Sequence, residues 1–222
     1  MSTNIATMAD LRTTLAAKLQ QQRAALPPAS GTKIRIKAKE GFIFPDGTTL
    51  DELEAVILDI RFVNALYTKR FTPGQVESPD CWSVSADATN MTPNDKSAKK
   101  ASSTCDECPK NEWGSDVGGG RGKACKNTIR LAIAAPDATE KSPVYTLDLA
   151  PTSTGPLLKV LRAMDNIPYQ TQIFNFSLDP KVDYAKVNST VLGTAPDDLA
   201  PHLLDLMEKS QSLIDRGFDY DA

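Results

Sequence analysis

The chain has 222 residues, of which 41% are hydrophobic and 24% are charged, and its formal net charge is −3. This composition allows a packed core, and the small negative charge argues against a protein that coats duplex DNA by bulk charge, although local basic patches can still bind. No apolar run reaches the length of a membrane span, about 18 residues, and the N-terminus lacks the pattern of a signal peptide. We therefore expect a cytoplasmic protein whose cysteines are not a disulfide framework.

The first 30 residues predict a helix. Leu11, Leu15 and Leu19 form one apolar stripe among strong helix formers. Pro27 and Pro28 end the pattern. We interpret this segment as a peripheral packing helix, with a partner or oligomer contact as the alternative.

Two strand patterns follow the predicted helix. Residues 32–38 alternate and lead to a Pro-Asp-Gly turn signal. Residues 54–71 form a longer alternating run that is typical of a half-buried strand. Its even-numbered positions from Val56 to Phe62 form the predicted core face, and Arg61 and Tyr67 lie on the opposite face.

The strand pattern stops between residues 72 and 126, where Pro, Gly, Ser, Asn, Asp and Lys dominate. A structureless loop of this length is uncommon inside a compact domain. Something other than a hydrophobic core must therefore hold the segment.

Regular patterns return after this segment. Strands are predicted over residues 127–136, 144–151, 169–179 and 183–193, and helices over 152–168 and 196–217. A helix between the third and fourth of five strands is the element order of an OB-fold. We therefore expect a mainly β protein, with a five-stranded OB-like barrel over residues 31–195, an insertion at 72–126 between strands one and two, and flanking helices. An unrelated α+β sheet or barrel with the same order is the alternative.

All four cysteines lie in the segment that has no core of its own, with the spacing Cys81-x23-Cys105-x2-Cys108-x16-Cys125. A Cys-x2-Cys turn presents two thiolates to one metal, and two further thiolates complete the closed tetrahedron that structural zinc prefers. Metal binding can supply folding free energy to such a loop. The pattern predicts one structural zinc ion, Zn²⁺, with these four ligands.

Other chemistry fits the same segment poorly. A redox pair would open a helix in a βαβ unit, and Pro109 directly after Cys108 does not match that setting. In a phosphate loop that ends at Gly122-Lys123, a glycine would stand at position 117 and a hydroxyl residue at 124, but these residues are Val117 and Ala124. His202 is the only histidine, so a nucleophilic triad is unsupported and we expect no enzyme.

Basic and aromatic residues gather around the cysteines and on the predicted non-core faces of the strands. Single strands of nucleic acid are held by aromatic stacking and a basic groove. A packing role is the alternative for each aromatic residue taken alone. The candidate nucleic-acid contacts are Arg61, Tyr67, Trp82, Lys99, Lys100, Lys110, Trp113, Arg121, Lys123, Lys126, Arg130 and Lys186.

Several short stretches resemble one family. PDGTTL, SPDCWS, CDECPKNEWGS, GKACK and LAPTS, within residues 42–180, are similar to a bacteriophage family of OB-fold single-stranded-DNA-binding proteins with a zinc-binding insertion. The resemblance implies a non-catalytic role in phage replication or recombination in the host cytoplasm, with the four cysteines as metal ligands. The short acidic tail, residues 218–222, is similar to tails that recruit replication proteins and compete with DNA for the groove.

Two other functions stay open on the sequence. The zinc loop could instead dock a protein partner, in a virion or replisome interaction module. The chain could also be an accessory subunit of a nuclease or polymerase. The sequence leaves the oligomeric state open.

Overall fold

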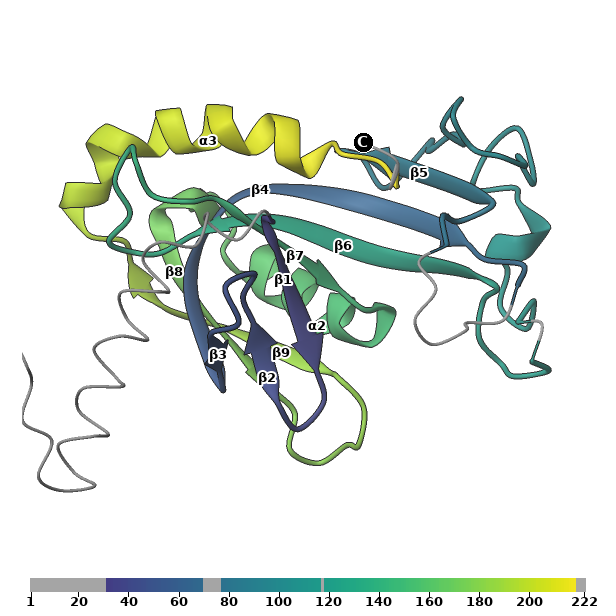
Figure 1. Ribbon diagram of the computed structural model, residues 1–222, viewed down its shortest axis with the longest axis horizontal. Helices are drawn as coiled ribbons and strands as arrows, with labels where there is room; N and C mark the ends of the chain where they lie inside the picture. The colour runs from purple at the N-terminus through teal and green to yellow at the C-terminus, as the bar shows by residue number, and fades with distance from the viewer. Residues whose placement is uncertain (1–30, 70–76, 117, 219–222) are drawn as a thin grey trace, which may run out of the picture.

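The computed structural model describes residues 31–69, 77–116 and 118–218 (Figure 1). The helix predicted over residues 1–30 and most of the acidic tail lie outside these ranges. Within them, neither helix has the length and apolar character needed to cross a membrane.

One sheet of nine strands dominates the fold (Figure 1). Its strands are β1 (Lys33–Lys37), β2 (Gly41–Ile43), β3 (Thr49–Leu50), β4 (Glu52–Leu66), β5 (Cys81–Ser85), β6 (Cys125–Ala134), β7 (Tyr145–Leu149), β8 (Gln172–Leu178) and β9 (Val187–Thr194). The order is β3-β2-β1-β7-β6-β4-β8-β9, with β5 paired to β4 off this path. The pairs are antiparallel except for β1 with β7.

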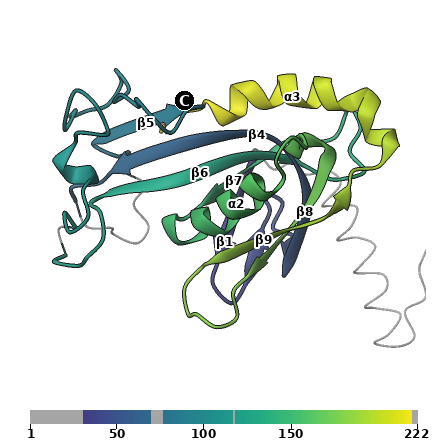
Figure 2. The same cartoon turned by 180° about the vertical axis from the view of Figure 1, so that it is seen from behind.

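Two helices cover the two faces of the curled sheet (Figures 1 and 2). They are α2 (Pro151–Ala163) and α3 (Ala200–Ile214), and three short 3-10 helices are η1 (Pro109–Asn111), η2 (Tyr169–Thr171) and η3 (Asp197–Leu199). A mainly β protein with helices against the sheet is therefore confirmed. The expected count of five strands is too low for the sheet, because β1, β2, β3 and β5 join it.

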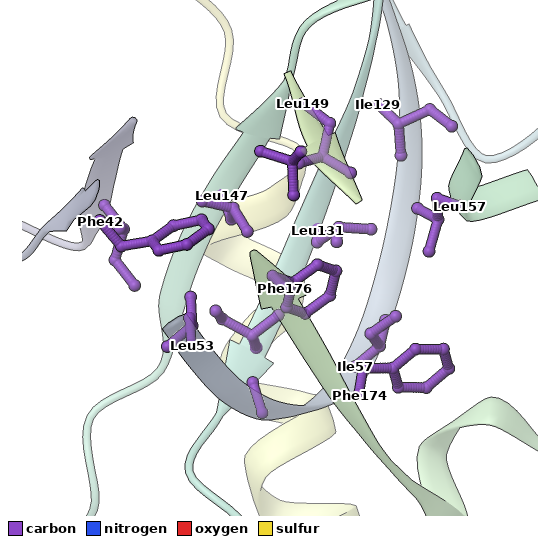
Figure 3. Packing of buried hydrophobic residues seen from close by; sticks show 14 residues of the cluster. Phe42, Leu53, Ile57, Ile129, Leu131, Leu147, Leu149, Leu157, Phe174 and Phe176 are labelled. Carbon is purple, nitrogen blue, oxygen red and sulfur yellow. The ribbon is translucent and has the colours of Figure 1, made fainter. Parts of the chain in front are cut away.

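The larger core lies between the concave face and α2 (Figure 3). Phe174 and Phe176 of β8 stack at 6.2 Å between ring centroids, and both are fully buried. Leu131 of β6 and Leu157 of α2 are buried in the same cluster. A second cluster, which includes Val56, Leu58 and Leu206, lies under α3. The sheet is thus apolar on both faces over much of its area.

A bulge in β4 changes which side chains face which core. The register passes from Ile57↔Ile133 to Asp59↔Ala132, so Leu58 is the extra residue. Val56 and Leu58 pack under α3, whereas Ile60 and Phe62 pack against the core on the α2 side. The predicted single core face from Val56 to Phe62 is therefore wrong, because the bulge shifts the period-two alternation by one residue.

The segment between residues 72 and 126 is only partly a loop. Cys81–Ser85 forms β5, which pairs with the last third of β4 from Phe62↔Ser85 to Leu66↔Cys81. The far end of the segment, Cys125, already belongs to β6. Backbone pairing therefore supports this region in addition to any metal.

The Phe176→Ala variant should lose about 3–5 kcal/mol of unfolding free energy, because it removes a fully buried ring from a packed core. Urea unfolding followed by circular dichroism measures the change. Leu204→Ala is the control: Leu204 is 76% exposed, and its truncation should change stability by less than about 0.5 kcal/mol. Equal losses in the two variants would contradict the described core.

Candidate metal centre and the adjoining groove

The four cysteines lie around one small space. Cys81, Cys105, Cys108 and Cys125 are all buried as free thiols. They line a single cavity of about 20 Å³. The structure therefore brings together the four residues that the sequence predicts as ligands, although as many as 23 residues separate neighbours in the chain.

Strand register places the first and last of these cysteines. Cys81 of β5 and Cys125 of β6 both pair with Leu66 of β4, one from each side. Directly paired residues share a face of the sheet, so the three side chains point the same way and form a small cluster. Because neighbouring strands lie about 4.8 Å apart, the two cysteine backbones stand roughly 10 Å apart.

A tight turn supplies the other two thiols. The Cys108 amide donates to the Cys105 carbonyl at 3.4 Å, and the Asn111 amide donates to the Cys108 carbonyl at 2.8 Å. The Asn111 side chain donates to the Cys105 carbonyl at 2.9 Å. The Cys105 amide donates to the Met91 carbonyl at 2.8 Å. These bonds fix the turn over the sheet.

The surroundings of Cys105 and Cys125 raise the pKa of both thiols. Burial, followed by the three neighbouring cysteines, raises the pKa of Cys125 to about 12. Burial also raises the pKa of Cys105. Its effect is larger than that of the hydrogen bonds from Asn64 and Ser83, which lower the pKa. Reactive cysteines have lowered pKa values, so this environment disfavours a redox pair. A bound cation would lower the pKa values of Cys105 and Cys125, because it stabilises the thiolates.

The thiols share a cavity but do not yet form a coordination shell. Among the residues that the structure describes, no three side chains of His, Cys, Asp or Glu are arranged to hold a metal ion as they stand. Zinc with four thiolates needs metal–sulfur distances of about 2.3 Å, so the sulfurs would have to draw together. Neutral thiols gain no electrostatic energy when their sulfurs approach one another, whereas thiolates gain it when they approach a shared cation. The chemistry of the donor set fits zinc, and zinc binding stays a prediction.

A groove adjoins this centre on the side of α2. Its outer part is a cavity of about 440 Å³ lined by Trp113, Lys123, Lys126 and the first turn of α2. Its inner part is a cavity of about 300 Å³, which shares Lys123, Asn127 and Thr154 with the outer part. We call these two connected cavities the Trp113 groove.

Trp113 is the exposed aromatic residue of the groove. Its side chain is 80% exposed, and the Lys123 ammonium lies 5.7 Å from its ring centroid. Lys126 donates to the Lys123 carbonyl at 2.8 Å and lies 3.9 Å from Asp116. An exposed indole with one ammonium group over its ring and a second lysine in the same cavity is a surface suited to stacking and to anions.

Two predicted nucleic-acid contacts, Arg61 and Arg130, instead hold the C-terminal part of the chain. Arg61 pairs with Asp59 at 2.7 Å and with Asp215 at 2.5 Å. Arg130 pairs with Asp148 at 2.8 Å and donates to the carbonyls of Ile214 and Arg216. Both guanidinium groups are buried.

The Trp82 side chain is likewise buried and packs against the C-terminal part of the chain. It is 5% exposed and meets Phe218 edge-on at 5.7 Å between ring centroids. A Cβ atom at Gly217 would come within 2.4 Å of the Trp82 ring. The structure therefore leaves Arg61, Arg130 and Trp82 little surface for a ligand.

The other candidates lie outside the Trp113 groove. Lys110 lines the cysteine cavity. Lys100 pairs with Asp95 at 2.5 Å, and Lys186 pairs with Asp179 at 2.8 Å. Lys99 and Arg121 are exposed, and Tyr67 is 38% exposed. Of the twelve predicted contacts, the groove brings together Trp113, Lys123 and Lys126.

The sequence did not reveal the remaining lining of the groove. Asn127, Asp106, Phe62 and Leu158 come from four separate segments, and only the folded sheet places them beside α2. Asn127, a polar residue at the start of an apolar strand, was the one available signal. His202, expected not to be a ligand, lies on α3 with its Nδ1 atom 3.9 Å from Glu140.

Comparison of the chain with protein-family models, with curated proteins and with solved structures finds no match.

Protein purified with zinc should contain about one zinc ion per chain, and Cys108→Ser should lower this content and destabilise the fold. Elemental analysis, with colorimetric detection of released metal, measures the stoichiometry. His202→Ala is the matched control and should keep the metal. Unchanged zinc content in Cys108→Ser, or loss in His202→Ala, would contradict the assignment.

The metal-free and zinc-loaded forms should respond oppositely to pH. The folded pKa of Cys125, about 12, lies above the ordinary value of 9.0, so the metal-free fold loses stability as pH rises from about 9 toward 12. The zinc-loaded fold should instead lose stability as pH falls from about 7 to 5, because protons compete with the metal for the thiolates. Urea midpoints across pH, with and without a chelator, test both signs. Parallel profiles would rule out metal bound by these thiols.

Proposed function

We propose that this chain is a non-catalytic single-stranded-DNA-binding protein of phage replication or recombination, with a structural four-cysteine zinc site. The observation that carries the proposal is the Trp113 groove, in which an exposed indole and two lysines line an open cavity beside the cysteines. The resemblance of the cysteine block to the phage family supports the same function.

The chemistry of the groove fits a flexible single strand. Every base has a flat face, so an exposed indole can stack on it without regard to sequence. Lys123 and Lys126 supply positive charge at the same cavity, although the chain as a whole has a net charge of −3. A local site of this kind binds phosphates without a strongly basic protein.

In this proposal Cys81, Cys105, Cys108 and Cys125 hold zinc, whose part is structural because four thiolates leave no open coordination position. Trp113 and Lys123 lie in the segment between Cys108 and Cys125. Ligands at both ends of this segment would fix its position against β6. The DNA-contacting surface would then be ordered before the strand arrives, which reduces the entropic cost of binding.

The strand pairing supports an OB-like reading of the barrel. Counted from β4, the strands β4, β6, β7, β8 and β9 are the five that we expected, and α2 lies between the third and the fourth. The first of them pairs with the second and with the fourth. The loop between strands one and two, a common oligonucleotide-binding element of OB-folds, would then carry Trp113.

The Trp113→Ala variant should bind labelled oligo(dT) about 5- to 150-fold more weakly, since stacking contributes about 1–3 kcal/mol per base. Fluorescence anisotropy at low salt measures the affinity. Lys126→Ala should weaken binding and lower the slope of log affinity against log salt by about one. Lys100→Ala, an ion-paired lysine outside the groove, is the control and should leave the slope nearly unchanged.

Absence of oligo(dT) binding at low salt by the folded, zinc-loaded chain would overturn the proposal. The exposed Trp113 surface would then favour the second hypothesis, a zinc loop that docks a protein partner in a virion or replisome.

A further inference from the structure

The inner cavity of the Trp113 groove combines apolar and hydrogen-bonding side chains. Phe62 of β4, Ile129 of β6 and Leu158 of α2 give it an apolar lining. Asp106 and Asn127 add polar groups at the same cavity. Its volume of about 300 Å³ lies at the lower end of the range of small-ligand pockets, about 300–1,000 Å³. Apolar side chains beside several hydrogen-bonding groups suit a flat heteroaromatic ring.

The free hydrogen-bonding capacity of this cavity consists largely of acceptors. Asp106 accepts from the Asn90 amide through Oδ2 at 3.1 Å, and its Oδ1 atom has no partner among the described residues. The Asn127 amide group donates to Asn64 Oδ1 at 2.6 Å, which leaves Asn127 Oδ1 as an acceptor. The Thr128 and Thr154 hydroxyls already donate to the carbonyls of Val63 and Pro151.

One cationic donor complements these acceptors. Lys123 Nζ donates to Asn111 Oδ1 at 3.3 Å, and Lys123 lines both cavities of the groove. An ammonium group has three donors, so Lys123 keeps the capacity to reach a ligand carbonyl. The cavity thus offers a carboxylate and an ammonium group beside the apolar side chains of Phe62, Ile129 and Leu158.

Guanine is the nucleobase that matches this set. Its N1–H and N2–H₂ groups are adjacent donors that a carboxylate accepts together, and its O6 and N7 atoms are acceptors for a lysine. Thymine has a single N–H between two carbonyls. Adenine and cytosine place an amino group beside a bare ring nitrogen, which a carboxylate repels.

We propose that the inner cavity receives one guanine base of the bound strand, with Asp106 at its N1–H and N2–H₂ edge and Lys123 at O6. The inference rests on the proposed function and adds base preference to it. A strand that stacks one base on Trp113 reaches the inner cavity through the shared residues Lys123, Asn127 and Thr154. The protein would therefore bind any single strand and prefer those that contain guanine.

Competition binding on the full zinc-loaded chain tests this preference. A dT tract with one central dG should bind about 5- to 150-fold more tightly than the all-dT strand, because a good bidentate contact discriminates by about 1–3 kcal/mol. A central deoxyinosine, which lacks the N2 amino group, should lose most of this gain. A single guanine per strand avoids structures formed by guanine runs.

Asp106→Asn should reduce the ratio of dG-strand affinity to all-dT affinity to less than about threefold. Glu107→Gln is the matched control, since Glu107 is an exposed neighbouring carboxylate that lines neither cavity, and it should keep the preference. Zinc content of both variants verifies that the turn is intact.

The outcomes separate the two proposals. Tight binding of all strands without a dG preference, or a preference that survives Asp106→Asn, overturns the guanine site and leaves single-strand binding standing. Failure of every strand to bind overturns both.

Discussion

The pairing of β4 with β6 is the interaction on which the rest of the structure depends. The ladder runs from Val56↔Ala134 to Leu66↔Cys125. At one end it is covered by α2 and α3 and builds both apolar clusters. At the other end it leaves the core and β4 pairs with β5, so that Cys125 of β6 and Cys81 of β5 flank Leu66 of β4 (Figure 1). The site is therefore aligned by the same hydrogen-bonded ribbon that forms the fold.

This ladder also sets two like charges side by side. Arg61 and Arg130 are direct partners in the register, an arrangement that is unfavourable by itself. Three carboxylates, those of Asp59, Asp148 and Asp215, offset the two cations. Burial alone would raise the pKa of Asp148, but Arg130 and Lys33 outweigh it and hold that pKa below its ordinary value. The end of α3 is drawn onto the sheet by these charges, which explains why both arginines are buried.

Much of the fold could be predicted from periodicity, and part of the site from spacing. The strands around Ile34, Leu131 and Phe176 and the helix around Leu157 follow their patterns closely. The bulge at Leu58 could not be predicted, because one extra residue leaves no mark in an alternating sequence. The alternating pattern correctly predicts that Arg61 and Arg130 lie on the face opposite the α2-side core. It does not predict that α3 covers that opposite face. The cysteine site could be predicted because the spacing of its four ligands is visible in the sequence. The Trp113 groove could not, because its lining residues come from separate segments that meet only in the fold.

The segment between Cys108 and Cys125 carries Trp113, and its position in the fold has an evolutionary consequence. Of the residues that the structure describes between Cys108 and Cys125, none contributes a side chain to either large apolar cluster. Their order depends on nearby turns, such as the Ser115 hydroxyl that donates to the Glu112 carbonyl and accepts from the Ala124 amide. Substitutions here can accumulate without loss of core packing. The segment is a separable cassette, whose surface chemistry can change while the sheet beneath it stays the same.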